Sequence, residues 1–355
     1  MNCHQKIRIA MIVCAAALIA AVVLAVTNII GTGLGYGYAN AEKYTAGEAE
    51  IPQAVRNLDV DWTEGAVTLE YHDLDTVLIR ETADKTIGED LRVRWWLDGD
   101  TLRVRYAKPG LRLALNLNKK LVLTLPRNAE MGAVSLSAAS ADLIVPALKA
   151  ESLKMEAASG NIRAEAAVKT LTAETASGKQ SLKTTGRAEV IRASAASGDI
   201  DIETEGADTL TASLASGRLK VAAAGESGEV SLSSASGEIR AEFDTLETFS
   251  ASSSSGSIDA VIGKAGKVTL SAASGNVDIC LGQAEKAEIS TASGRVTAAL
   301  PTVPGFTAKI ETASGRIENE IPLTVSGKTY ACGDGSASVS IHTASGNILL
   351  KERQE

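Results

Sequence analysis

Aromatic side chains are scarce in this chain of 355 residues, where Phe, Trp and Tyr together make up 3%. Its interior must therefore be filled by small and branched aliphatic side chains. The four cysteines are too few for a dense disulfide framework, although a pairing of Cys280 with Cys332 stays open at this stage. Histidine occurs only as His4, His72 and His342, so few positions can supply the histidine base of a hydrolytic triad.

Basic residues are also in the minority. Lys6 and Arg8 are the only charged residues before Glu42, which leaves 33 of the 35 basic residues against all 43 acidic ones, a net charge of −10. No basic block interrupts this acidic segment. Binding to nucleic acid and docking on anionic lipid are both disfavoured by such a field, and we expect no nucleic-acid partner.

The first thirty residues differ in kind from the rest. An apolar run from Ile9 to Val26, extending weakly to Ile30, is long enough to span a bilayer. The two basic residues before it favour a cytoplasmic N-terminus. We predict a short cytoplasmic tail over 1–8 and a transmembrane signal anchor over 9–30. The chain would be a single-pass protein of the cell membrane, with residues 31–355 extracytoplasmic.

A cleaved signal peptide is the alternative. Ala39-Asn40-Ala41 has the A-x-A pattern of a cleavage site, and cutting after Ala41 would release a secreted protein. The apolar run is long for a signal peptide and the site lies far beyond it, which favours the uncleaved anchor. Both alternatives export the remainder of the chain.

A Ser-Gly dipeptide recurs through the second half of the chain. Eight of the nine steps between its glycines measure 18 to 21 residues and the last measures 31; the glycines are Gly160, Gly178, Gly198, Gly217, Gly237, Gly256, Gly275, Gly294, Gly315 and Gly346. A fixed period near 20 is the signature of a repeat architecture.

Each repeat has strand-like alternation on both sides of the dipeptide. In residues 267–285, Val268 and Leu270 alternate with polar residues before Ser274-Gly275, and Val277 and Ile279 do so after it. Period-two alternation predicts two half-buried strands. We expect the glycine to form the corner, through positive φ or close backbone approach, and the serine hydroxyl to bond a nearby N–H.

One repeat buries too few side chains to offset the ordering of its backbone, so repeats must stack. We therefore predict an all-β fold, a single-stranded β-solenoid of about 19-residue coils behind the transmembrane helix. The predicted parts are a linker over 31–50, irregular N-terminal coils or a cap over 51–130, and regular repeats with a C-terminal cap over 131–355. The 31-residue step predicts an insertion near 324–336.

The recurring ASG-polar-Ile motif resembles a bacterial β-strand-repeat family of unknown function whose members are proposed adhesins. The segment Leu121–Pro126 and the ending Gly333–Leu350 (GDGSASVSIHTASGNILL) carry the same resemblance, which covers most of residues 51–355. It implies a β-solenoid with a surface or envelope role, often behind an N-terminal membrane helix. The family supplies no catalytic residues to transfer.

Catalytic and metal sites are not predicted. The corner serines have no histidine repeating beside them. Asp199, Asp201 and Glu203 share one face of a strand, but calcium needs six or more converging oxygens. We therefore expect no catalytic, metal-binding or cofactor-binding residues.

The function predicted from the sequence is an adhesin-like surface or envelope interaction without catalysis. Its partners would be the membrane, through the N-terminal helix, and an envelope protein or surface polymer. One alternative is an envelope-stress or regulatory module that binds a peptide, a membrane component or a partner protein, through the region of Trp62, Trp95 and Trp96. A more distant alternative is a polysaccharide-acting β-helix enzyme, which requires convergent carboxylates in a groove. The oligomeric state and the handedness stay open.

Overall fold

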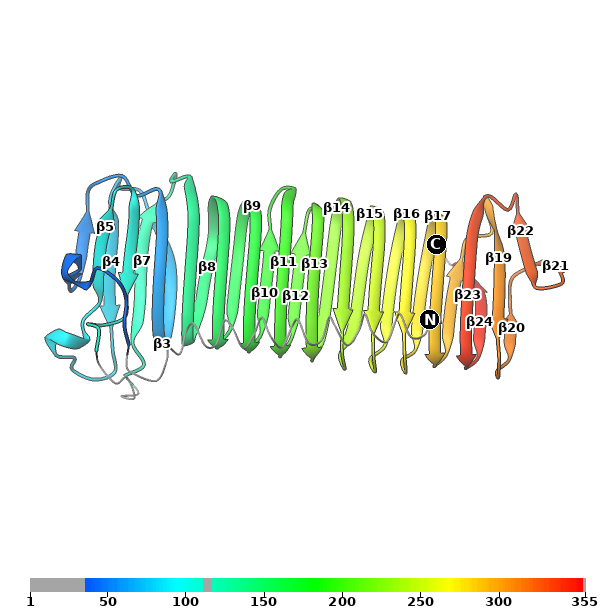
Figure 1. Cartoon of the computed structure of the whole chain (residues 1–355). Coiled ribbons are helices and arrows are strands. Elements are labelled where there is room, and N and C mark those ends of the chain that lie inside the picture. Colours follow the sequence, from blue (N-terminus) through cyan, green and yellow to red (C-terminus); the bar gives the residue numbers. More distant parts are fainter. Residues whose placement is uncertain (1–35, 111–116, 354–355) are drawn as a thin grey trace. The chain divides into compact units, whose positions relative to one another are not determined.

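The computed structural model describes residues 36–110 and 117–353. These residues contain no α-helix, only strands and the short 3₁₀ turns η1 (Ala41–Lys43) and η2 (Glu89–Leu91) (Figure 1). The prediction of an all-β fold is confirmed. Within the described ranges, no helix has the length and hydropathy to span a membrane. The predicted cytoplasmic tail and signal anchor over 1–30 lie outside these ranges.

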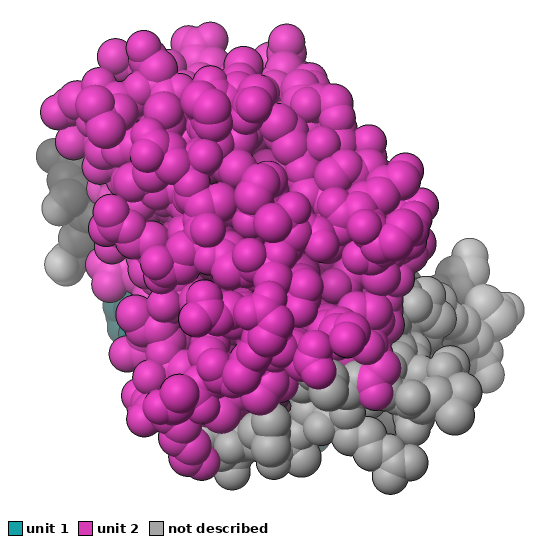
Figure 2. All heavy atoms as spheres, turned by 90° about the vertical axis from the view of Figure 1, so that its left-hand side faces the viewer, with its two compact units in different colours: residues 1–18, 189–191, 199–355 teal, residues 19–188, 192–198 magenta. Residues whose placement is uncertain are grey.

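The chain divides into two compact units, coloured in Figure 2. In the described part, unit 2 comprises residues 36–188 and 192–198, and unit 1 comprises 189–191 and 199–353. Unit 2 holds β1 (Thr45–Ala46), β2 (Ala49–Ile51), β3 (Asn57–His72), β4 (Val77–Thr82), β5 (Arg94–Asp98), β6 (Thr101–Arg105), β7 (Lys120–Pro126), β8 (Met131–Ser159), β9 (Ile162–Ser177) and β10 (Gln180–Thr184). Strand β11 (Ala188–Ser197) has residues in both units.

Unit 1 is a stack of β-coils. Its strands are β12 (Ile200–Thr204), β13 (Ala207–Ser216), β14 (Arg218–Ser234), β15 (Glu238–Ser253), β16 (Ile258–Ala272), β17 (Val277–Ser293), β18 (Val296–Leu300), β19 (Gly305–Thr312), β20 (Ile317–Asn319), β21 (Thr324–Ser326), β22 (Thr329–Gly333), β23 (Ala337–Ser345) and β24 (Ile348–Glu352). Parallel partners follow at the predicted interval: Leu219 pairs with Ile239, Ile239 with Ile258, and Ile258 with Val277. The β-solenoid-like architecture therefore agrees with the prediction.

The core of unit 1 lies between the two strands of each coil. In β15 buried residues alternate with more exposed ones over 239–243 and again over 249–253; Ile239, Phe243 and Phe249 are buried, while Arg240 and Glu242 are exposed. The two phenylalanine rings, one from each side of the coil, meet with centroids 5.6 Å apart. Because alternate side chains point to opposite faces of a strand, the apolar ones of all coils of unit 1 together form one continuous interior.

The corner glycines form a ladder because neighbouring coils approach too closely for a side chain. A Cβ at Gly256 would fall on the carbonyl oxygen of Gly237, and one at Gly275 on that of Gly256. In unit 2, Gly178 meets Gly160 in the same way. The predicted close approach is therefore present at the corners of both units.

At two of the ten corners, the hydroxyl that accepts the glycine N–H is not the predicted one. The ten corner serines are exposed, and the N–H groups of Gly237 and Gly256 donate instead to Ser234 Oγ and Ser253 Oγ, at 2.7 and 2.8 Å. These two serines lie three residues before the glycine and are buried beneath the turn. A buried hydroxyl can satisfy the N–H without competition from water, which the exposed corner serine cannot do.

The C-terminal end of unit 1 is stacked out of chain order (Figure 1). Strand β23 pairs in parallel with β17 on one side and with β19 on the other, and β24 lies between β18 and β20. The last coil of the chain is thus inserted between the two coils that precede it. Beyond β19, strands β22 and β21 add antiparallel pairs, and the outermost strand is only three residues long. A short last edge limits pairing with other chains.

The N-terminal end of unit 2 has a related order. Strand β3 pairs in parallel with β8, and its other edge pairs with β6 and β7, which lie between them in the chain. Strands β4 and β5 then pair antiparallel with β7 and β6. Figure 2 looks onto this end of unit 2. Strands β1 and β2 lie within the predicted linker and are ordered by pairing with β5 and β4.

Candidate binding surface

The acidic residues that the sequence analysis considered as metal ligands do not converge on one point in the structure. Just before the acidic strand β12, Asp199 Oδ1 accepts the N–H of Arg218 at 2.9 Å, and within the strand Asp201 Oδ1 lies 3.9 Å from Lys220 Nζ. Among the described residues, no group of three or more His, Cys, Asp or Glu side chains is arranged to hold a metal ion. The carboxylates of this strand lie on a solvated face with basic neighbours.

The two described cysteines do not pair. Cys280 and Cys332 are both free thiols. Cys332 is buried, with Sγ 3.9 Å from the carbonyl oxygen of Thr302. The disulfide that the sequence left open is therefore absent between these two residues.

The tryptophan region of unit 2 is mostly interior. Trp62 is fully buried and donates its indole N–H to the carbonyl oxygen of Lys119 at 3.0 Å. Trp96 is half-buried, with Lys43 Nζ 4.6 Å and Arg103 Cζ 5.8 Å from its ring centroid. The aromatic rings are therefore used largely in contacts within the unit.

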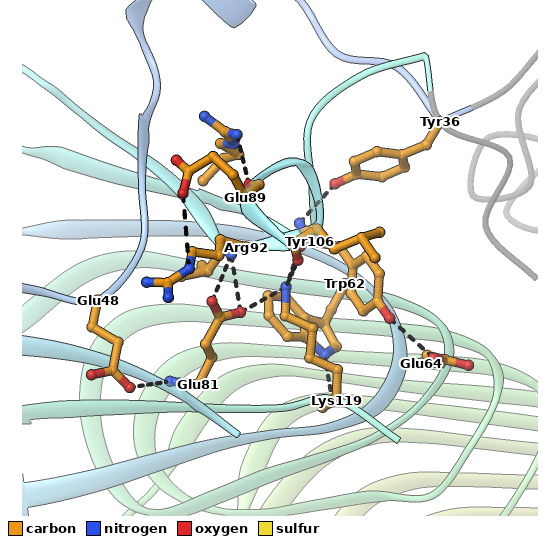
Figure 3. Close-up of polar contacts among 12 residues, drawn as sticks. Tyr36, Glu48, Trp62, Glu64, Glu81, Glu89, Arg92, Tyr106 and Lys119 are labelled. Carbon is orange, nitrogen blue, oxygen red and sulfur yellow. Dashed lines mark hydrogen bonds and ion pairs between the residues drawn. The ribbon is translucent and has the colours of Figure 1, made fainter. Parts of the chain in front are cut away.

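A buried ion pair holds this region together (Figure 3). Lys119 Nζ lies 2.7 Å from Glu81 Oε2 and donates to the carbonyl oxygens of Leu91 and Tyr106 at 2.6 and 2.5 Å. Burial lowers the pKa of Lys119, and Glu81 opposes that shift. Since each N–H of the ammonium group has an acceptor, the charge is compensated as a buried charge must be, and the pair is a structural element of this end of unit 2.

Unit 1 has an open groove of about 860 Å³ that crosses β16, β17, β23 and β19. Its apolar lining includes Ala272, Ala292 and Ala344, and its hydroxyl lining includes Ser271 and Ser290. These are the strand faces just before the corners. The volume falls in the range of ligand pockets.

The inserted coil completes a row of side chains across the groove. Ser290, His342 and Glu311 occupy matching positions on the adjacent strands β17, β23 and β19. His342 Nδ1 lies 4.0 Å from Glu311 Oε2, and Ser290 Oγ lies 3.4 Å from Ser271 Oγ. Sequence analysis missed this row because chain order places residue 342 after residue 311, whereas the fold places it before.

Both carboxylates that line the groove have lysine partners. Glu288 lies 2.7 Å from Lys286 Nζ, and the hydrogen bond from this lysine lowers the pKa of Glu288. Glu311 lies 3.0 Å from Lys328 Nζ, and that hydrogen bond lowers the pKa of Glu311, with Lys309 contributing in the same direction. Glycoside hydrolysis by two carboxylates needs one of them as a proton donor with a raised pKa. These two carboxylates are instead held in the ionised form.

Comparison with known proteins gives one family and three solved chains, two of which have proposed roles in adhesion. The family model described as Toastrack DUF4097 matches residues 55–262. A proposed cell adhesion protein from Clostridium sporogenes shares 10% identity at a TM-score of 0.19, over 87% of this chain and 100% of that one. A proposed adhesin from Bacteroides fragilis shares 13% identity at a TM-score of 0.26, over 87% of this chain and 97% of that one. No curated protein matches the chain.

Proposed function

Since this chain belongs to the Toastrack DUF4097 family, whose model covers more than half of it, we propose that it acts by binding at the cell surface or envelope, without catalysis. The family predicted from the sequence is confirmed by this match. In the proposal, residues 9–30 anchor the chain in the membrane, and the coils outside the cytoplasm present an adhesin-like surface.

The groove of unit 1 is the observation that carries this proposal. It is open, of ligand size, and formed by regular strands rather than by mobile loops. A site on paired strands is preorganised, so binding there costs little ordering of the protein. The lysine-paired Glu288 and Glu311 argue for recognition and against the polysaccharide-cleaving alternative.

The regulatory alternative has less support from the geometry. Its proposed contact region contained Trp62, which has no exposed surface, and Trp96, which is engaged by Lys43 and Arg103. Trp95 is half-buried as well, and a partner would need to displace Lys43 and Arg103 to reach the ring of Trp96. The outward strand face of unit 1 is available without such rearrangement.

The test is binding of the detergent-solubilised full chain to isolated envelope fragments. We expect saturable binding that is weakened roughly tenfold or more by the double change Ser271→Lys and Ser290→Lys, because two uncompensated charges would enter the contact. Thr297→Lys is the matched control, since Thr297 points outward from β18 on the other strand face. Absence of saturable binding by the unchanged protein would contradict the proposed function.

A further inference from the structure

The groove of unit 1 combines an apolar floor with a hydroxyl rim. The partly exposed Ala273, Ala292 and Ala344 line it together with the hydroxyls of Thr269 and Ser271. A pyranose ring has the same division, with C–H groups on its faces and hydroxyls at its edge. We propose that this groove binds a neutral linear glycan that lies across the strands, which deepens the proposed function and rests on it.

The outward rows that lead to the groove are uncharged. Ser250 and Ser252 of β15 pair with Thr269 and Ser271 of β16, and the two rows hold only serine and threonine from β13 to β16. In unit 2 the equivalent positions of β8 and β9 carry charged residues, namely Lys154, Glu156 and Glu174. Inside the groove the same rows carry Glu288 and Lys309 in one and His342 and Glu311 in the other. The absence of charge is therefore confined to the track from β13 to β16 that leads to the groove, and this track matches an uncharged ligand.

Hydroxyl groups are suited to sugars because each can both donate and accept a hydrogen bond. Adjacent strands lie about 4.8 Å apart, close to the advance of one sugar unit along an extended β-linked chain. One sugar can therefore meet one coil, and the same pair of hydroxyls repeats from β13 to β16. An extended peptide advances only about 3.3 Å per residue and falls out of step with the coils.

A peptide also lacks a backbone to pair with in this groove. Strands β17 and β23 each have parallel neighbours on both sides, so their N–H and C=O groups are engaged in the ladder. Addition of a peptide strand requires an open sheet edge. Side-chain hydroxyls and methyl groups are what the groove offers.

The charged end of the groove does not favour a polyelectrolyte. Glu288 is paired with Lys286, and Glu311 with Lys309 and Lys328, at distances from 2.7 to 3.7 Å. The three lysines exceed the two glutamates by one charge, and a single net positive charge is too little to select a polyelectrolyte. These side chains supply hydrogen-bonding groups at the end of the track instead.

The experiment titrates the detergent-solubilised full chain with chitohexaose and cellohexaose as neutral probes, and with a hexamer of galacturonic acid as the anionic one. At least one neutral hexasaccharide is expected to bind saturably and to compete with envelope fragments. Ser271→Lys should weaken its affinity roughly tenfold, while Thr297→Lys leaves it within about twofold. Ser250→Lys, which lies outward on the same track, is a second variant in case the first disturbs the groove.

The outcomes separate this inference from the function on which it rests. If envelope fragments bind but no neutral hexasaccharide does, or if the anionic hexamer binds better, the glycan inference is overturned and the binding function stands. Equal binding by the Ser271→Lys and Ser250→Lys variants and the unchanged protein would also overturn it. If neither fragments nor sugars bind, both proposals fail.

Discussion

The corner positions require glycine because the neighbouring coil lies too close for a Cβ, and not only because of the conformation of the turn itself. The regular spacing of the Ser-Gly pairs made these positions predictable, because close stacking leaves no room for a Cβ. The partner of the glycine N–H was not predictable. At Gly256, the hydroxyls of Ser253 and Ser255 both lie nearby in the chain. Only the structure shows that the buried Ser253 accepts the N–H of Gly256.

Gly256→Ala should destabilise the protein by about 2–3 kcal/mol, since a new methyl group in a packed site forces the backbone to shift. Its Cβ would fall on the carbonyl oxygen of Gly237. Gly88→Ala is the matched control, because a Cβ there has no atom within 4 Å. Urea unfolding measures both, and equal stability of the two variants would contradict the ladder.

The buried Lys119–Glu81 pair gives a second prediction about single residues. Lys119→Met leaves a buried carboxylate without its cation and should cost about 3–5 kcal/mol. Adding Glu81→Gln removes the stranded charge, so the double variant should recover part of that loss. Chemical denaturation of the single and double variants tests this coupling, and additive losses would show that the two side chains do not interact.

Strand alternation and coil length follow from the sequence, but the order of the last coils does not. The 31-residue step between Gly315 and Gly346 is equally compatible with a loop inserted into a sequential stack and with a coil that folds back. The residues that decide between them, such as Ile341 and Ile348, have the same apolar pattern in either case. The row of Ser290, His342 and Glu311 was hidden for the same reason.

Removal of residues 337–355 tests the inserted coil. In a sequential stack this deletion would remove only an end coil. Here it removes the partner that β17 and β19 share, so we expect amide protection to be lost over 286–293 and 306–312 together. Hydrogen exchange with mass spectrometry measures this, and retained protection over 306–312 would contradict the inserted position.

Paired acidic residues on adjacent strands give a pH-dependent prediction. Asp259 and Asp278 are register partners in β16 and β17, and burial, followed by the charge of Asp278, raises the pKa of Asp259. A folded-state pKa above the unfolded one means that stability is greatest below the unfolded pKa and is lost as pH rises through the folded pKa.

Asp278→Asn should therefore stabilise the protein at pH 7, by less than about 1 kcal/mol because the pair is exposed. The gain should vanish near pH 3, where protonation of Asp259 removes the repulsion. Asp244→Asn, with the same change of charge on a neighbouring coil, is the control. Urea unfolding at the two pH values is the measurement, and a gain of equal size at both would contradict the like-charge explanation.

For the molecule as a whole, the sequence yields the class of fold and the family, and the structure adds the surface on which function is proposed. The absence of a repeating histidine turned attention from the corner serines to the outward faces. It did not point to the groove, which exists only once β23 lies between β17 and β19. Trp62 was predicted to belong to a partner-binding region, but its side chain lies in the core.

The most direct test of the account is the hydrogen-exchange footprint of the full chain with and without envelope fragments. The account predicts added protection in unit 1 over 269–274, 288–293 and 340–344, the segments that line the groove. Protection confined to 94–106, around Trp95 and Trp96, would instead favour the regulatory alternative and contradict binding at the groove.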